Sequence, residues 1–227
     1  MADKLTSVPP GAPIDRLRPV SRERVAVVVA GRSVCLLPAR EAARLGLEAG
    51  RAWTAGLAAK VRPAAERDEA LGRALRLLAA RPRSRGELLE RLSRAGVREE
   101  VAAEIVDRLQ ASGHVDDAAY AKLYAQSLAD SGKGAGKRLI VAKLRRRRVA
   151  GDVADRAARE ACAGRDEQAE ADALAARKWR TMPEKLEVHV RARRVLGALA
   201  RRGFAPGIAA AAVRKLARGV PLDEMEE

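Results

Sequence analysis

The residues best suited to bind a charged partner lie in one basic run, 137–148, with the sequence KRLIVAKLRRRR. This run holds seven Lys or Arg residues and no Asp or Glu. On a helix, four consecutive arginines cannot all face a core, so most of them must point outward. Outward arginines can neutralise phosphates or form forked pairs with carboxylates. The run therefore predicts contact with a polyanion, although a simple solvated helix face would have the same composition.

Side chains that commonly perform catalysis or bind metals are few and scattered. His114 falls at a predicted turn and His189 within a charged helix, and neither lies in a motif. Cys35 and Cys162 are far apart in sequence and form neither a metal-binding cluster nor a disulfide framework, so we interpret them as buried thiols. No zinc-protease, serine-hydrolase or nucleotide-binding motif occurs. We expect a binding protein rather than an enzyme, with no catalytic residue, metal site or cofactor.

The glycine-rich segment 131–136, SGKGAG, raises the alternative of a phosphate-binding loop. The P-loop pattern requires GxxxxGK[ST] between a strand and a helix. Segment 131–136 has neither that spacing nor a preceding strand pattern. We therefore interpret it as a flexible connection.

The overall charge also points to a polyanionic partner. The chain has 227 residues, a net charge of +15 and 33% charged residues. Such a balance favours nucleic acid or an acidic protein surface as the partner, and an Arg-rich solvated surface is the alternative. Aromatic residues make up only 2%, so the core must consist mainly of Ala, Leu and Val. We find no signal-peptide pattern and no apolar run of about 18 residues, and we expect a cytoplasmic protein without a membrane partner.

A pattern of helix end, turn and new helix occurs three times. A leucine is followed four positions later by a turn residue, then by a hydrophobic residue, and then by another hydrophobic residue four positions on. The copies are Leu92-Gly96-Val97-Val101, Leu144-Arg148-Val149-Val153 and Leu199-Gly203-Phe204-Ile208. Ser84 and Glu87 predict a capping box before the first copy. The repeats predict a mainly α fold, an elongated tandem array of three-helix units.

The N-terminal part has a different pattern. Val25–Val29 and Val34–Leu37 flank a glycine turn and predict a β-hairpin. Pro38–Leu45 predicts a short helix, and Arg51–Thr54 is a candidate third strand. We therefore divide the chain into a mobile lead 1–19, a β-hairpin with a short helix 20–62, three-helix units 68–113, 114–164 and 166–219, and an acidic tail 220–227. Residues 63–68 are the predicted linker.

Several segments carry a family resemblance. They are LLAARPRSRGELLERLSRAG (77–96), SGHVDDAAYAKLY (112–124), the GKGAG loop followed by a basic helix, and GRSVCLLPAREAARLGLEAG (31–50). Over about residues 20–218 the chain resembles the RecX family, bacterial regulators of the RecA recombinase. Arg148 replaces a usual glycine, which predicts a remodelled turn. A common arginine near Leu128 is missing, and the third unit resembles the family least.

The resemblance implies a function. RecX-like proteins lie in the groove of the RecA–DNA filament, and they inhibit ATP hydrolysis, strand exchange and filament extension during recombination and DNA repair. The expected partners are therefore RecA filaments and, weakly and without sequence preference, single- or double-stranded DNA, bound by a monomer. The candidate contact residues are Lys137, Arg138, Lys143, Arg145, Arg146, Arg147, Arg201 and Arg202.

The alternative function is that of a stand-alone DNA-binding protein of helix-turn-helix type. Such a protein would concentrate base-reading polar side chains on one recognition helix and would usually form a dimer. Here the last helix of each unit is Ala-rich and the charge is spread over several units, which favours the regulator.

Overall fold

The computed structural model describes residues 2–132 and 134–217. The chain forms two compact units, and each is described by itself below. Unit 1 comprises Met1–Pro82 with Leu88–Val115, and unit 2 comprises Arg83–Glu87 with Asp116–Glu227. The predicted acidic tail 220–227 and the last two residues of the predicted third unit, 218–219, lie outside the described residues.

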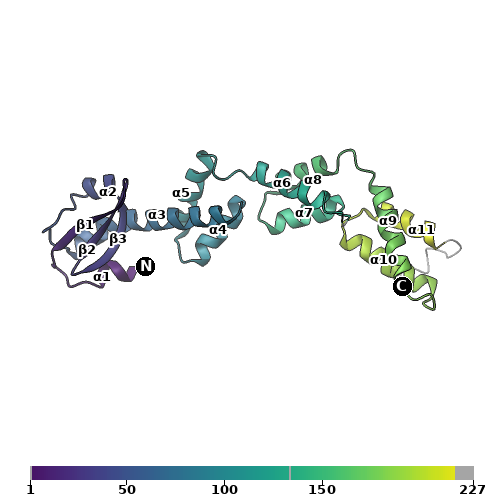
Figure 1. Ribbon diagram of the computed structural model, residues 1–227, viewed down its shortest axis with the longest axis horizontal. Coiled ribbons are helices and arrows are strands. Elements are labelled where there is room, and N and C mark those ends of the chain that lie inside the picture. Colours follow the sequence, from purple (N-terminus) through teal and green to yellow (C-terminus); the bar gives the residue numbers. More distant parts are fainter. Residues whose placement is uncertain (1, 133, 218–227) are drawn as a thin grey trace. The chain divides into compact units, whose positions relative to one another are not determined.

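Unit 1 begins with a three-stranded antiparallel sheet in the order β1-β2-β3 (Figure 1). The strands are β1 (Ile14–Ser21), β2 (Arg24–Val29) and β3 (Arg32–Pro38). Ala30 and Gly31 join β2 to β3 with φ of 48° and 72°, the left-handed pair that a two-residue hairpin turn requires. The predicted hairpin is therefore confirmed.

The segment predicted as a mobile lead, 1–19, contains helix α1 (Ala2–Thr6) and most of strand β1. Its apolar residues Leu5, Val8 and Ile14 are buried in the core of the sheet unit. The four prolines masked this signal. Residues 51–54, the expected third strand, form only an isolated bridge between Ala52 and Pro13.

Two helices complete this part of unit 1. The predicted short helix is present as α2 (Ala39–Arg44). The predicted linker is not, because α3 runs without a break from Ala55 to Ala80 through Pro63. A proline inside a helix removes one backbone hydrogen bond. Burial of Leu57, Val61 and Ala65 against the sheet core offsets that loss.

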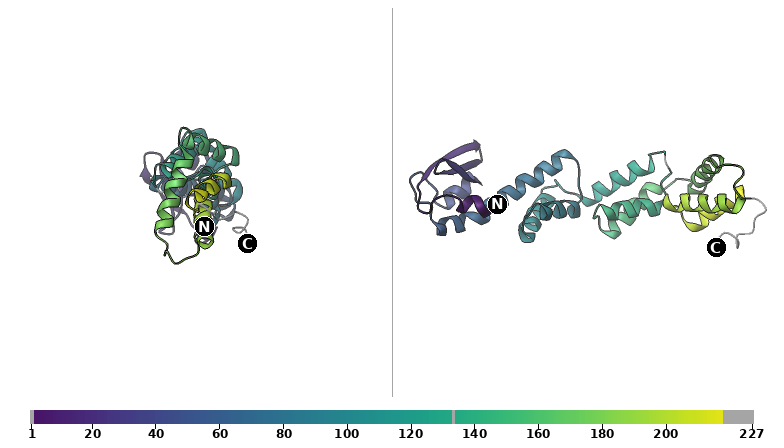
Figure 2. Two further views of the ribbon diagram at one scale, coloured as in Figure 1. Left: turned by 90° about the vertical axis from the view of Figure 1, so that its right-hand side faces the viewer. Right: turned by 90° about the horizontal axis from the view of Figure 1, so that it is seen from below.

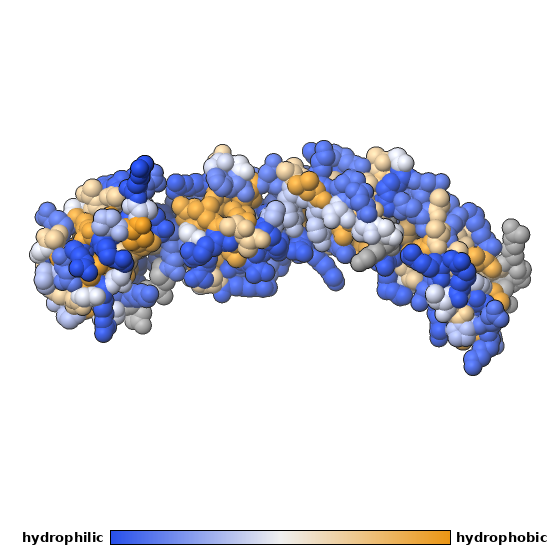
Figure 3. Space-filling model, viewed as in Figure 1, coloured by the Kyte–Doolittle hydropathy of each residue, from blue (hydrophilic) through white to orange (hydrophobic). Residues whose placement is uncertain are grey.

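The C-terminal half of α3 forms the first three-helix unit with α4 (Arg85–Arg94) and α5 (Glu99–Ala111). Leu88, Leu92 and Ile105 are buried at its centre. Gly96 ends α4 with φ of 77°, as the glycine turn predicts. Figure 3 shows apolar residues gathered on the visible face of this three-helix unit. Hydrophilic residues surround this apolar patch.

Unit 2 contains two further three-helix units (Figure 2). The first consists of α6 (Asp117–Ala129), α7 (Lys137–Arg146) and α8 (Gly151–Cys162), and the second of α9 (Glu167–Arg180), α10 (Val188–Arg201) and α11 (Pro206–Leu216). The Asp116 and Asp166 carboxylates cap α6 and α9. The predicted fold class, mainly helical with a small β-containing N-terminal part, is confirmed.

Alanines form the buried faces of two helices of unit 2. On α6, Ala121 and Ala125 are fully buried, whereas the larger Leu123 is 70% exposed. On α9, Ala171 and Ala175 are fully buried. Small alanines allow helix axes to approach closely, so the close packing of α6 with α8 selects them over the larger side chains.

Candidate polyanion interface

Helix α7 separates its apolar and basic side chains. Ile140 and Leu144 are fully buried in the core of the α6–α8 unit. Arg138, Arg145 and Arg146 are exposed, because they lie on the opposite side of the helix, with Arg138 about two turns before the other two. Lys137 and Lys143 are half-buried beside the apolar stripe. The predicted outward orientation of the basic run is therefore confirmed for these three arginines and for Arg148, which follows the helix and is also exposed.

The turn between α10 and α11 lies directly against the start of α7. The Gly136 N–H donates to the Arg202 carbonyl at 2.8 Å, and the Arg138 N–H donates to the Gly203 carbonyl at 3.2 Å. This contact brings Arg201 and Arg202, which are distant in sequence, beside the first turn of α7. Arg201 is exposed and Arg202 is half-buried. The basic surface thus combines residues from two three-helix units of unit 2.

Arg147 differs from its neighbours, because its side chain is held within unit 2. Its Nη1–H donates to Glu87 Oε1 at 2.9 Å, and its guanidinium carbon lies 5.4 Å from the centre of the Tyr124 ring. The hydrogen bond to Glu87 is the main cause of a raised Arg147 pKa, so this residue stays charged. An arginine with these partners is the least available of the predicted contact residues.

Arg145 keeps most of its freedom despite one acidic neighbour. Its Nη2 lies 3.5 Å from Asp155 Oδ2, and both side chains are about half exposed. An exposed pair at this distance contributes little stability, roughly 0–1 kcal/mol. Arg145 can therefore exchange Asp155 for a partner's phosphate or carboxylate.

The helix dipole accounts for only part of this charge. Lys143, Arg145 and Arg146 lie in the last turn of α7, where positive charge favours the helix. Lys137 and Arg138 lie in its first turn, where the same charge opposes the helix dipole. Stabilisation of α7 therefore cannot explain the two cations at its start, which lie next to the α10–α11 turn.

The segment before α7 is packed more tightly than the predicted flexible connection. Ala135 and Gly136 are buried. The Arg165 guanidinium donates to the Ala135 carbonyl at 3.1 Å while pairing with Glu170. The prediction of flexibility is therefore wrong for 135–136, and Lys133 lies outside the described residues. Sequence patterns could not predict the role of Arg165, because its contact with Ala135 is a tertiary contact across 30 residues.

Arg148 takes the left-handed conformation that glycine takes in the other two repeats, with φ of 59°. The turn is therefore not remodelled, contrary to the prediction. Its backbone lies against Gly86, and a Cβ on Gly86 would be 2.6 Å from the Arg148 carbonyl oxygen. A glycine on the receiving helix thus makes room for a turn residue that has a side chain.

Both histidines contact a polar neighbour two residues away in the sequence, and both cysteines are free thiols. His114 Nδ1 lies 2.8 Å from Ser112 Oγ, and His189 Nδ1 lies 3.2 Å from Glu187. The cysteines are half-buried rather than fully buried as predicted. Across 2–132 and 134–217, His, Cys, Asp and Glu nowhere form a group of three suited to a metal ion. Nor does any helix in those ranges have the length and apolar character needed to cross a membrane.

Comparison with known proteins links this architecture to one family. A model described as "RecX, first three-helix domain" matches residues 70–109, and one described as "RecX, third three-helix domain" matches residues 166–213. The second match corrects the expectation that the third unit would resemble the family least.

Curated relatives resemble this chain in sequence over most of their own length. The chain is 38% identical over 151 residues to "Regulatory protein RecX" of Thermobifida fusca, an alignment that covers 66% of this chain and 80% of the relative. It is 34% identical over 141 residues to the protein of the same name from Streptomyces coelicolor, with coverages of 62% and 73%.

Two crystal structures share the fold. A structure described as that of regulatory protein RecX has a TM-score of 0.66 at 20% identity and covers 88% of this chain and 97% of its own. A structure of RecX from Lactobacillus salivarius has a TM-score of 0.57 at 18% identity, with coverages of 66% and 96%.

Proposed function

Since the chain belongs to the RecX family of regulatory proteins, we propose that it binds the RecA–DNA filament in its groove. Binding inhibits ATP hydrolysis, strand exchange and filament extension by RecA, and so modulates recombination and DNA repair. We further propose that it acts in the cytoplasm as a monomer, with three-helix units 68–113, 114–164 and 166–219.

The observation that carries the proposal is the exposed basic surface of α7. Arg138, Arg145 and Arg146 point away from the buried stripe of the helix. Such arginines can contact both an acidic protein groove and the phosphates of DNA within it. Lys137, Lys143, Arg201 and Arg202 flank this surface and complete the proposed contact. Arg147 contributes by positioning α7, because Glu87 and Tyr124 already engage its guanidinium.

The test is ATP hydrolysis by RecA on single-stranded DNA with this protein added in substoichiometric amounts. The wild-type protein should lower the rate. A variant with Arg138→Glu, Arg145→Glu and Arg146→Glu should lose this effect, because each change replaces an attractive charge with a repulsive one. A matched control carries Arg40→Glu, Arg91→Glu and Arg108→Glu, three exposed arginines of unit 1 with the same total charge change.

Two outcomes would count against the proposal. Equal inhibition by both triple variants would show that α7 is not the contact. Absence of any effect on RecA, together with tight binding to duplex DNA, would favour a stand-alone DNA-binding protein. The structure gives that second function little support, because the alanines of α8 pack into the core, as Ala154, Ala157 and Ala158 do.

A further inference from the structure

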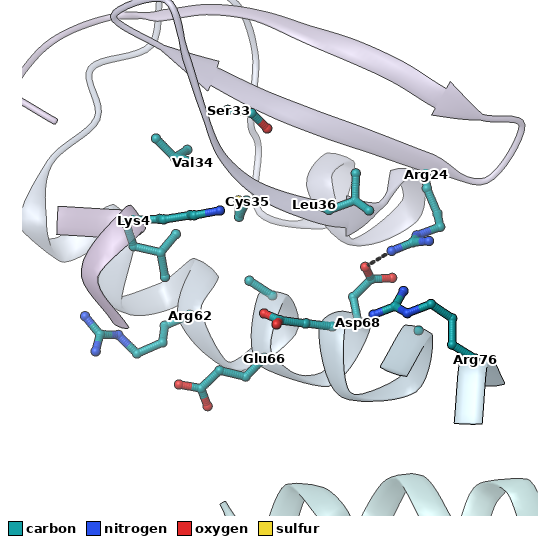
Figure 4. A pocket seen from close by; sticks show the side chains of 14 residues that line it. Lys4, Arg24, Ser33, Val34, Cys35, Leu36, Arg62, Glu66, Asp68 and Arg76 are labelled. Atoms are coloured by element: carbon teal, nitrogen blue, oxygen red, sulfur yellow. Dashed lines mark hydrogen bonds and ion pairs between the residues drawn. The ribbon is translucent and has the colours of Figure 1, made fainter. Parts of the chain in front are cut away.

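A pocket of about 540 Å³ lies within unit 1, between strand β3 and helix α3, with α1 at one side (Figure 4). Val34 and Leu36 of β3 and Leu5 of α1 supply apolar surface. One face of α3 forms the opposite wall, because its lining residues recur every three or four positions from 62 to 76. None of the residues given for its lining belongs to α7.

The acidic side chains of this pocket are already neutralised. Each of the three carboxylates has a cation of unit 1 as its partner; the pairs are Asp68–Arg24, Glu66–Arg98 at 2.6 Å and Glu69–Arg73 at 3.2 Å. Asp68 is only 7% exposed. These pairs leave the acidic residues with little capacity to attract a cationic ligand.

The remaining cations of the pocket have no such compensation. Lys4, Arg62 and Arg76 line it and form no ion pair within the described part of the chain. In addition, the Arg24 Nε–H is buried and has no hydrogen-bond acceptor among the described residues. A buried donor without an acceptor is unfavourable. The three uncompensated cations therefore give the pocket net positive charge that an incoming anionic group can use.

A glycine on the pocket wall keeps the space open. Gly72 lies in the interior of α3, where alanine would favour the helix. A Cβ at this position would meet Arg76 Nη1 at 3.5 Å and Arg24 Nη2 at 4.0 Å, which are ordinary contact distances. Packing within the protein therefore does not require a glycine here.

The pocket is built for binding rather than reaction. Cys35 lines it, but burial is the main cause of a pKa raised to about 12, so the thiol stays protonated at neutral pH. Neither histidine lines it. A protonated thiol is a poor nucleophile.

From these features we propose that the pocket binds a short acidic peptide segment of a partner protein. An apolar side chain of the peptide packs on Val34 and Leu36, and its flanking carboxylates pair with Lys4, Arg62 and Arg76. Nucleic acid fits less well, because none of the described residues that line the pocket is aromatic, so bases would have no ring to stack on. This site goes beyond the proposed function and does not depend on it.

An array of synthetic hexapeptides, each with one Leu, Ile or Phe among Asp and Glu residues, tests the proposal. Fluorescence anisotropy then measures the affinity of the best peptide for the full chain. Gly72→Leu should fill the pocket and weaken binding at least about tenfold while keeping the helical circular dichroism. Arg62→Glu and Arg76→Glu should each weaken it about tenfold through loss of a charge-assisted hydrogen bond. Lys60→Glu is the matched control, an exposed cation of α3 outside the pocket.

The contrary outcomes are equally clear. The proposal fails if no acidic peptide binds, or if Gly72→Leu and both arginine variants bind the peptide as tightly as the wild-type protein. Binding of a short oligothymidylate that Gly72→Leu abolishes, without peptide binding, would assign the pocket to nucleic acid. The arginine variants of α7 should bind the peptide as tightly as the wild-type protein. Failure of the peptide proposal and failure of the proposed function can therefore be told apart.

Discussion

Two helix starts in unit 2 receive the turn of a later helix pair, and the two contacts differ in where their glycines lie. At the start of α4, the Ser84 hydroxyl donates to the Arg147 carbonyl, and Gly86 lies against Arg148. At the start of α7, Gly136 and Arg138 donate backbone N–H groups to the carbonyls of Arg202 and Gly203. The first contact thus has its glycine on the receiving helix, as Gly86. The second has glycines on both sides, Gly203 in the turn and Gly136 at the start of α7, where a Cβ on Gly136 would be 2.4 Å from the Gly203 carbonyl oxygen.

Both contacts require missing side chains, on the receiving helix alone in the first and on both sides in the second. A Cβ on Gly203 would be 2.1 Å from the Leu139 nitrogen, and one on Gly86 would be 2.3 Å from the Arg148 Cβ. Real Cβ atoms do not approach other atoms so closely. Arg148 can therefore replace glycine in its turn, at the cost of left-handed strain, only because Gly86 has no side chain.

The largest effect is expected for Gly203→Ala. Its φ of 81° strains any side chain, and the new Cβ would also clash with the α7 backbone. Together these effects should lower the free energy of unfolding by about 3 kcal/mol in urea denaturation. Gly164→Ala is the control, because its φ of 75° gives the same strain but no atom lies within 4 Å. Equal losses for the two variants would mean that the clash at α7 is absent.

A smaller loss is expected for Gly86→Ala. The new Cβ would clash with Arg148, but alanine also favours the helix, so the net loss should be about 1.5 kcal/mol. Hydrogen–deuterium exchange should locate the loosening at the starts of α4 and α8. Gly207→Ala in α11, where nothing lies within 4 Å, should leave stability unchanged or slightly higher. A Gly86→Ala protein as stable as wild type would contradict the close approach.

The smallest effect, of opposite sign, is expected for Arg148→Gly. Glycine removes the left-handed strain but makes the unfolded chain more flexible, so stability should rise by only about 0.5 kcal/mol. The same change should reduce the loss caused by Gly86→Ala, because the nearest clashing atom is the Arg148 Cβ. Urea denaturation of the two single variants and the double variant measures this coupling. Strict additivity would show that the two residues do not interact.

Much of the candidate interface could be predicted from the sequence, because charge and helical periodicity are local properties. The run 137–148 gave the exposed arginines of α7 directly. The engagement of Arg147 could not be foreseen, because its partner Glu87 is 60 residues away. The pocket beside α3 was also missed, since it depends on strand β3 and helix α1 packing against a helix that the sequence split at Pro63.

The sequence alone determined the hairpin, the glycine turn at Gly96 and the three repeated helix pairs. Those features depend on local φ preferences, caps and periodicity, which neighbouring residues set. Only the tertiary structure decided that α6 buries Ala121 and Ala125 while exposing Leu123, and that Gly86 accommodates Arg148. These choices follow from how closely two elements approach, and that distance depends on side chains far apart in the chain.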